Sequence, residues 1–315
     1  MPLMPLESVR VVDPILTTVV QGYGAPEFVG SVLFPKVDVS ARSGRIIEFG
    51  RGDFVLFGTR RGPGGPTRRR GLEYGNSRYE LYQDALEGEL PMEYLEEAKA
   101  GGIPFSLQEE TAKGTMRSLD LNLEYAQATE ASNFSRYDAN HKITLSGSSL
   151  WTNPASDPTV QVNAWKEAVR RSIGAYPNTA VMGASGFQAA VNHPAIRDQI
   201  KYTSADSVTP DMLAKIWGLA KLVIGESLAL NENTGDLFDV WGDSFYLAYV
   251  PQTISSNRAP SFGYTYTLKG YPIVEEPYYE RNHKTWYFPV TAERQPLVTS
   301  IQAGFLAKNL TGAAA

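Results

Sequence analysis

The sequence predicts an α+β protein, and three observations predict it. Helical and strand-like patterns alternate along the 315 residues without the repeated strand–helix–strand units that build a doubly wound sheet. The chain carries 28 Gly, 20 Pro and 17 Tyr, which favours many turns and much strand, with helices in the minority. One apolar stripe, between residues 106 and 133, is long enough for a single extended helix. With 43% hydrophobic and 20% charged residues, a sizeable core is expected, in one elaborate domain or two smaller ones.

Charge and cysteine content exclude several classes of protein. The net charge of −5 argues against a domain that coats the nucleic-acid backbone, because such domains are strongly basic. Without any Cys there is no disulfide framework, thiolate metal site or cysteine nucleophile, which fits a reducing cytosol. Residues 1–6 lack the basic and apolar regions of a secretory signal, and no window reaches the roughly 18–20 apolar residues that span a bilayer. We therefore expect a soluble protein, cytosolic when made, without membrane contact.

Residues 1 to about 36 are expected to form an extended arm. They show no sustained periodicity, and prolines interrupt them at five positions. The apolar run 15–20 ends at Gln21-Gly22-Tyr23-Gly24. An arm of this kind takes its order from neighbouring molecules.

The next segment, about 37–90, predicts a long two-stranded hairpin. Strand-like runs at 45–49 and 53–57 are followed by the period-two alternation of a returning strand at 77–83. Between the first two runs, Arg51-Gly52-Asp53 matches the integrin-binding tripeptide by letters, but a tight turn between strands is the favoured interpretation. The tip, 59–70, holds turn formers and cations and nothing to pack.

The clearest helix starts at Ser106. Ser106 and Glu109 form a capping-box pattern, in which each side chain can bond the other residue's backbone N–H. Apolar residues then recur every three or four positions: Ala112, Met116, Leu119, Leu123 and Ala126. A helix from Ser106 to about Asn133 is roughly 40 Å long at 1.5 Å per residue. Since this exceeds what one compact core needs, the helix is expected to serve as a backbone on which other parts lie.

From residue 163 onward, shorter helices and strands alternate. Helices are predicted at 163–173, from a Ser185 cap to a stop before Pro194, and from a Thr209 cap with Pro210 at its first position to about Gly218. Strands are predicted at 179–182, 221–225 and 240–250, and through the aromatic tail 265–305.

Patterns that carry catalysis or metal binding are weak. The three histidines, His141, His193 and His283, have no metal-ligand spacing and are interpreted as structural. Ser185 resembles the nucleophile of a G-x-S-x-G elbow, but Gly186 comes one residue early, so a helix cap is favoured. Adjacent glutamates do not face one another on a helix, and the glycines of 62–65 form no phosphate loop. We predict no catalytic, cofactor-binding or metal-binding residue, and no cofactor.

One cluster of cations needs an interpretation. Five arginines lie on a Gly/Pro-rich scaffold: Arg60, Arg61, Arg68, Arg69 and Arg70. A solvated loop and a nucleic-acid contact are two alternatives, although no aromatic residue lies between Thr59 and Gly71 to stack on a base. The favoured alternative is an inter-subunit contact, in which the guanidinium groups bind carboxylates on a partner chain.

The ordered set of pieces resembles the major capsid proteins of tailed double-stranded DNA phages, whose fold is of the Hong Kong 97 type. Residues 176–183 and 193–202, with the passage H-P-x-I-x-D-x-I-K, resemble a strand and helix of that family. Residues 209–226 carry a T-x-x-x-L-A-x-x-x-G helix followed by a short strand. A strand-turn at 240–248 and a closing strand at 303–307 complete a resemblance that covers nearly the whole chain.

The resemblance implies an N-terminal arm (1–36), an extended loop (37–90), a peripheral domain with a long spine helix (91–175), an axial domain (176–260) and C-terminal strands returning to the peripheral domain (261–315). It implies a protein that is not an enzyme and that self-assembles into pentamers and hexamers of an icosahedral phage head enclosing double-stranded DNA. The expected partners are other copies of itself, a separate scaffolding protein, portal and decoration proteins, and packaged DNA through non-specific contact. The expected location is the virion, after assembly in the host cytoplasm.

Two features of some relatives have no match here. No charged helical scaffolding segment is visible ahead of the arm, and no Lys and Asn match the crosslinking pair, so crosslinking is not carried over. Two other functions stay open. One is a cellular nanocompartment shell of the same fold, and the other is a cytosolic strand-rich hydrolase whose catalytic groups converge only in three dimensions.

Overall fold

The computed structural model describes residues 11–24, 27–46, 59–61, 65, 67, 78–101, 106–201, 208–231, 234–251 and 261–312. The α-helices among these residues are α1 (Pro14–Gln21), α2 (Gly30–Leu33), α3 (Met92–Gly101), α4 (Leu107–Ser132), α5 (Pro158–Ile173), α6 (Ala184–Asn192), α7 (Pro194–Ile200) and α8 (Pro210–Ile216). Single 3₁₀ turns occupy Phe134–Arg136, Ala139–His141, Gly147–Ser149 and Ile301–Ala303. The strands are β1 (Lys36–Val39), β2 (Ser43–Arg45), β3 (Arg78–Glu80), β4 (Tyr82–Pro91), β5 (Lys142–Thr144), β6 (Thr179–Gly183), β7 (Lys221–Gly225), β8 (Leu228–Leu230), β9 (Leu237–Asp239), β10 (Ser244–Ala248), β11 (Gly263–Leu268), β12 (Ile273–Val274), β13 (Tyr278–Glu280), β14 (Thr285–Val298) and β15 (Gly304–Lys308).

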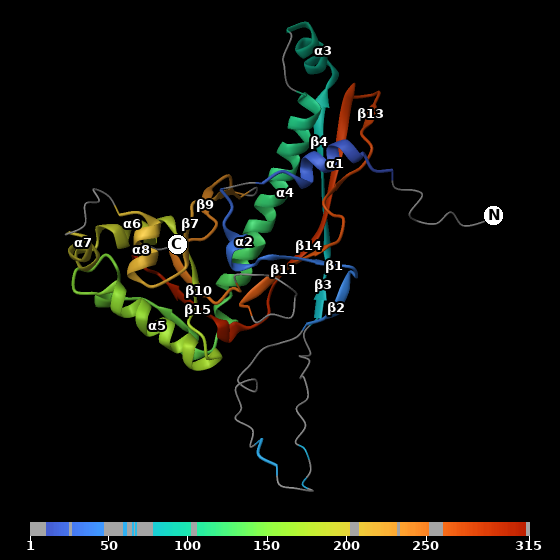
Figure 1. Ribbon diagram of the computed structural model, residues 1–315. Coiled ribbons are helices and arrows are strands. Elements are labelled where there is room, and N and C mark those ends of the chain that lie inside the picture. The colour runs from blue at the N-terminus through green and yellow to red at the C-terminus, as the bar shows by residue number, and fades with distance from the viewer. Residues whose placement is uncertain are drawn as a thin grey trace.

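A five-stranded sheet, in the order β5-β15-β10-β6-β7, is buried on both faces. Because side chains alternate along a strand, Ala180 and Met182 of β6 enter one apolar cluster while Val181 enters another. Helices α5 to α8 cover the first face, and α2 with the end of α4 covers the second. Figure 1 shows this sheet with its helices as a rounded body beside the elongated rest of the molecule.

The first face is packed mainly with aromatic rings. Trp165 lies with its ring centroid 5.4 Å from that of Phe305 and 5.8 Å from that of Phe245. Trp151 and Trp217 close the cluster over Phe245 at 5.9 and 5.6 Å. Such pairs stabilise beyond their buried area, so this cluster is the main core of the rounded body.

A second, six-stranded sheet is built around the 14-residue strand β14. Strand β4 pairs antiparallel with β14 over its whole length, and β11, β12 and β13 pair with the opposite edge. Helix α4 lies along this sheet (Figure 1), burying Met116 and Leu119 against Phe288 and Val290. Gly88 permits this approach, since a Cβ there would lie 2.4 Å from Thr115 Oγ1.

The predicted long helix is confirmed. Helix α4 spans 26 residues, and Ser106 Oγ accepts from Glu109 N at 3.3 Å, as expected of its N-cap. The helix predicted at 163–173 is also observed, and begins five residues earlier, at Pro158. Thr209 caps α8 with Pro210 as its first residue, as predicted.

The described part of segment 1–36 contains helices, whereas the sequence predicted an extended conformation for this arm. Asp13 Oδ1 accepts from the N–H groups of Ile15 and Leu16 at 2.9 and 3.0 Å, and starts α1. Helix α1 then buries Leu16 and Val20 against α4 of the same chain. Asp13-Pro14 is a cap followed by a first-turn proline, and this local signal outweighed the lack of periodicity.

Two shorter elements also differ from expectation. Helix α6 starts at Ala184, so Ser185 lies inside it, and its N-cap Gly183 makes no side-chain bond. Ser185 Oγ instead donates to Asp243 Oδ1 at 3.3 Å. The strand predicted at 240–250 is limited to β10, because Gly242 turns the chain with φ +54°.

Strand pairing joins segments that the division drawn from sequence separates. Strand β15, expected to return to the peripheral segment, pairs with β5 of that segment and with β10 of the axial segment in one five-stranded sheet. Helix α5, placed in the same segment, packs on that sheet as well. The five-segment division therefore stays a prediction.

The chain after β15 is fixed to the same body. Leu310 is fully buried, and a Cβ on Gly186 would lie 2.4 Å from its Cδ1. Asp243 Oδ2 accepts from both Thr311 N and Thr311 Oγ1, at 2.9 and 2.7 Å. Residues as far as Thr311 thus belong to the core.

Candidate functional site

The base of the arginine-bearing loop is a short ladder. β2 pairs with β3, with Gly44 opposite Tyr79. Beyond it, Arg60 and Arg61 are exposed, and Arg61 Nε donates to Gly65 O. Arg45 of the run predicted at 45–49 belongs to β2. The rest of that run from residue 47 on, the run predicted at 53–57, the Arg51-Gly52-Asp53 turn, and Arg68, Arg69 and Arg70 lie outside the described residues. The contact role of the five arginines remains a prediction.

Two contacts fix this base on the six-stranded sheet. The ring of Tyr79 stacks on Tyr266 of β11 at 4.8 Å between centroids and 10° between planes. Arg42 donates twice to Glu293, each bond being 2.8 Å long. Glu293 is buried while the Arg42 side chain is 68% exposed, so this ion pair fixes position more than it adds stability.

The opposite end of the same sheet is acidic. There the end of β4 leads into α3, and α4 begins nearby (Figure 1). Six exposed glutamates belong to these elements: Glu87, Glu89, Glu93, Glu96, Glu97 and Glu110. The ten residues of β4 separate this acidic end from the loop base by about 33 Å. Exposed Lys99, Arg281 and Lys284 also lie at this end, so carboxylates outnumber cations there.

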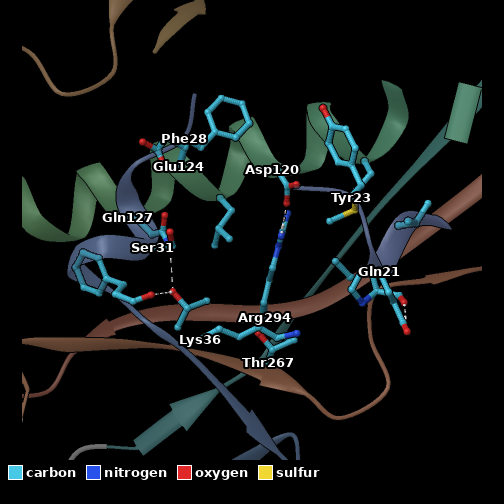
Figure 2. A pocket seen from close by; sticks show the side chains of 17 residues that line it. Gln21, Tyr23, Phe28, Ser31, Lys36, Asp120, Glu124, Gln127, Thr267 and Arg294 are labelled. Carbon is cyan, nitrogen blue, oxygen red and sulfur yellow. Dashed lines mark hydrogen bonds and ion pairs between the residues drawn. The ribbon is translucent and has the colours of Figure 1, made fainter. Parts of the chain in front are cut away.

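Between these ends lies a cavity of about 320 Å³ (Figure 2). Its walls are the segment from α1 to β1, the middle of α4, and strands β11 and β14. Both cations and carboxylates line it, including Lys36, Arg294, Asp120 and Glu124. The cavity marks where the N-terminal segment crosses the long helix.

Glu124 joins three parts of the chain. Its carboxylate accepts from Val29 N at 2.9 Å, Gly30 N at 2.8 Å and Trp241 Nε1 at 2.6 Å, and it is 1% exposed. It thereby caps α2, whose own N-cap residue makes no side-chain bond. Only glycine fits at position 30, because a Cβ would lie 2.0 Å from Gln127 Oε1. Through this one group α2, α4 and the loop before β10 are held together.

Asp120, one turn earlier on α4, joins the helix to the sheet. Arg294 of β14 donates to Asp120 Oδ1 and to Leu119 O, both at 2.6 Å. Burial raises the pKa of Asp120, against the lowering effect of Arg294. Burial likewise raises the pKa of Glu124, against the lowering effect of Trp241 and the two backbone donors. These are positioning groups in a low-dielectric setting.

Two of the three histidines, His141 and His193, are buried and hydrogen-bonded, and the third lies at the surface. His141 contacts Ser172 Oγ at 2.7 Å and Gly304 O at 2.8 Å. His141 is 1% exposed and Ser172 is 4% exposed. His193 contacts Ser156 Oγ at 3.1 Å and accepts from Ala195 N at the start of α7. Both Ser–His pairs are buried, so neither serine is open to a substrate. His283 is exposed and pairs with Glu280 at 3.0 Å.

The described part of the chain contains neither a metal-binding cluster nor a membrane-crossing helix. There, His, Asp and Glu side chains do not gather in any group of three or more that could hold a metal ion. Within the same ranges, every helix falls short of the length and apolar character that a membrane crossing requires.

Sequence reasoning missed Asp120 and Glu124. The sequence does contain a signal for them, because Asp120 and Glu124 are four residues apart and would repel one another on a solvent-exposed helix. Such a pair suggests that each carboxylate has a partner elsewhere in the fold. Their partners Arg294 and Trp241 lie more than 100 residues away, beyond the reach of any local pattern.

Comparison with known proteins gives consistent relatives. The family model described as phage major capsid protein E matches residues 126–215. The major capsid protein of Burkholderia phage BcepMu is 32% identical over 312 residues, which cover 98% of this chain and 99% of that protein. A phage-related protein from Bordetella bronchiseptica RB50, known as a crystal structure, is 36% identical with a TM-score of 0.83, covering 97% of this chain and 99% of the other.

A more distant likeness concerns the fold alone. An encapsulin complex from Synechococcus elongatus PCC 7942 matches with a TM-score of 0.55 at 10% identity, covering 92% of this chain and 89% of the other. The α+β class predicted from the sequence is confirmed by the mixed helices and sheets and by these neighbours. Since a major capsid protein is 32% identical along almost its entire length, the chain belongs to the phage major capsid protein family.

Proposed function

We propose that this chain is the shell-building subunit of a tailed-phage head, assembling into pentamers and hexamers of an icosahedral shell around double-stranded DNA. The observation that carries the proposal is the full-length relationship to a phage major capsid protein. The encapsulin likeness, at 10% identity, speaks for the fold and does not favour a nanocompartment. The buried Ser–His pairs give a hydrolase no support either.

The shape of the molecule supports a role in assembly. A 26-residue helix and a 14-residue strand form an elongated platform beside the rounded body (Figure 1). Such a platform exposes much surface per residue, as a subunit with several neighbours needs. Many modest contacts made at once sum to a stable shell, because each additional contact forms within an assembly that is already held together.

In this proposal the segments take the parts expected of the family: arm 1–36, extended loop 37–90, peripheral domain 91–175, axial domain 176–260 and returning strands 261–315. The partners are further copies of the chain, a separate scaffolding protein, portal and decoration proteins, and packaged DNA held without sequence-specific contacts. The chain carries no catalytic function. It is assembled in the host cytoplasm and ends in the virion.

Assembly of the purified protein tests the proposal directly. Light scattering and negative-stain microscopy are expected to show closed particles, or sheets of hexamers and pentamers. A monomer at every salt concentration, also after addition of the scaffolding protein of the parent phage, would contradict it.

The loop arginines test one contact within the shell. We expect that replacing Arg60, Arg61, Arg68, Arg69 and Arg70 together with Ala lowers particle yield and leaves the unfolding temperature of the monomer unchanged, because Arg60 and Arg61 are exposed. Particle yield by sedimentation and monomer unfolding by circular dichroism separate the two effects. A full yield of particles removes the contact role from these arginines.

A further inference from the structure

The small hairpin of β8 and β9 presents an apolar face to solvent. Leu230 pairs with Leu237, and Leu228 lies two residues from Leu230, so the three side chains share one face. They are 59%, 66% and 51% exposed, respectively. We refer to Leu228, Leu230 and Leu237 as the leucine face.

The opposite face of this hairpin holds it in place. The Phe238 ring meets Tyr125 of α4 edge-on at 5.9 Å between centroids, and Ala229 packs against the second cluster of the rounded body. Tyr125 points away from the side of α4 that covers the six-stranded sheet, since nine residues separate it from Met116 and each turns the helix by about 100°. The leucine face is thus held on the solvent side of the hairpin, beside the long helix.

Carboxylates border the leucine face. Asp239 pairs with Leu228 and lies on the same face, while Glu226 precedes β8 and Asp236 precedes β9. All three are exposed. The surface is apolar at its centre and anionic at its rim, so it suits a partner that is apolar and cationic.

A segment of the chain that lies mostly outside the described residues has that composition. Residues 47–61 contain the apolar side chains Ile47, Phe49, Phe54, Val55, Leu56 and Phe57. Their three cations, Arg51, Arg60 and Arg61, outnumber the two acids Glu48 and Asp53, and the pair Arg60-Arg61 has no acidic residue beside it. About 30 residues connect Arg45, the last residue of β2, to Arg78, the first residue of β3. A connection of this length that leaves and rejoins the same base can reach about 50 Å from it.

We propose that the leucine face receives residues 47–61 of an adjacent copy of the chain, with its phenylalanines on the leucines and its arginines on the carboxylate rim. The inference rests on the proposed shell function, which brings copies together, and it names the surface that the extended loop contacts. The acidic end of the platform offers carboxylates as well, but its exposed apolar side chains are the single aliphatic Leu86 and tyrosines with a polar tip, such as Tyr94 and Tyr279. The leucine face matches the segment in both apolar character and charge.

Cysteine crosslinking tests the proposal, because the natural chain has no cysteine. In assembled particles of the double variant Phe57→Cys, Leu230→Cys, mild oxidation is expected to link each copy to the next and give a ladder beyond the dimer on denaturing gels. Each single variant gives a dimer at most. A disulfide needs Cα atoms within about 7 Å, so the ladder reports contact.

Three outcomes would overturn the inference. A Leu230→Cys dimer as abundant as the ladder would mean that leucine faces pair with each other. A disulfide within one chain would mean that the loop folds back on its own copy. A ladder from Phe57→Cys with Glu93→Cys in place of Leu230→Cys would move the contact to the acidic end. If particles form and no pair crosslinks, the inference fails while the shell function stands.

Substitution of the leucine face gives a second measurement. Changing Leu228, Leu230 and Leu237 together to Ser is expected to weaken association by about tenfold or more and to leave the monomer folded. Val160→Ser, on an equally exposed aliphatic residue of α5 (63% exposed), is the matched control and leaves association unchanged. Equal assembly of the triple variant and the control would contradict the proposal.

Discussion

The two large sheets of this molecule are stabilised in different ways. In the five-stranded sheet, β6 and β10 are buried at every position and meet apolar side chains on both faces. In the six-stranded sheet, β4 buries only Gly88 and Leu90 of its ten residues, and within the described chain it pairs with β14 alone. The first sheet completes its own core, and the second is a platform with an open edge.

Besides the apolar packing of α2 and α4 on the five-stranded sheet, a buried polar junction holds the platform to the rounded body. Glu124 accepts from Trp241 of the body and from the backbone of the N-terminal segment, whereas Asp120 on the same helix binds Arg294 within the platform. Apolar packing tolerates small shifts, whereas buried hydrogen bonds require defined positions. The comparison teaches that the rounded body contributes most of the stability, while the carboxylates of α4 fix the position of this helix relative to its neighbours.

The largest effect is expected in the body. Phe245→Ala removes a fully buried ring that contacts Trp151, Trp165 and Trp217, and should lower the free energy of unfolding by about 4 kcal/mol. Urea unfolding of the monomer, followed by tryptophan fluorescence, measures it. Leu86→Ala on β4, which is 41% exposed, is the platform control and should cost less than about 1 kcal/mol. If the two variants lose similar amounts of unfolding free energy, the two sheets do not differ in how they are stabilised.

The next effect concerns the junction. Glu124→Ala leaves the N–H groups of Val29, Gly30 and Trp241 without their acceptor, and should cost about 3 kcal/mol. Hydrogen exchange is expected to speed up at α2 and near Trp241 more than in β6. If hydrogen exchange speeds up equally in both sheets, Glu124 supports the whole fold and not the junction alone.

A pH series sharpens the role of the two carboxyls. Burial raises the pKa of Asp120 and Glu124 above the ordinary values of 3.8 and 4.5. As the pH rises from the ordinary to the raised values, the folded state keeps protons that the unfolded state has released. These groups therefore make the free energy of unfolding fall with rising pH, by at most about 1.4 kcal/mol per pH unit for each.

The variant Asp120→Asn, Glu124→Gln lacks this contribution. The stability difference between wild type and variant should therefore decline with rising pH through that window, and stay constant below both ordinary values. Urea unfolding at a series of pH values measures the difference. An increase with rising pH would mean that the hydrogen bonds to the carboxylates outweigh their burial.

The smallest effect is expected in the N-terminal segment. Asp13→Ala removes the cap of α1 and should cost about 1 kcal/mol, seen as faster hydrogen exchange in α1. Asp13→Ser keeps an acceptor at the cap and should restore most of the protection. If α1 exchanges unchanged in the alanine variant, packing of Leu16 and Val20 alone holds this helix.

The parts of the fold that local patterns determine could be predicted from the sequence. Ser106, Thr209 and the apolar stripe of α4 act within a few residues, and the helices they predict are observed. Asp13-Pro14 was an equally local signal that the surrounding prolines obscured. Strand partners and the Glu124 junction depend on residues far apart in sequence, such as Trp241, so no pattern within one segment contains them. The contact role of the arginines depends on a second copy and remains a prediction for the same reason.

The position of β15 has a consequence for biosynthesis. In the five-stranded sheet it lies between β5 and β10, so an element from residues 304–308 separates two strands that are translated earlier. A ribosome-bound chain that ends before residue 304 has β5 without its neighbour and β10 with one open edge. The rounded body therefore becomes complete only after nearly all of these 315 residues have been translated.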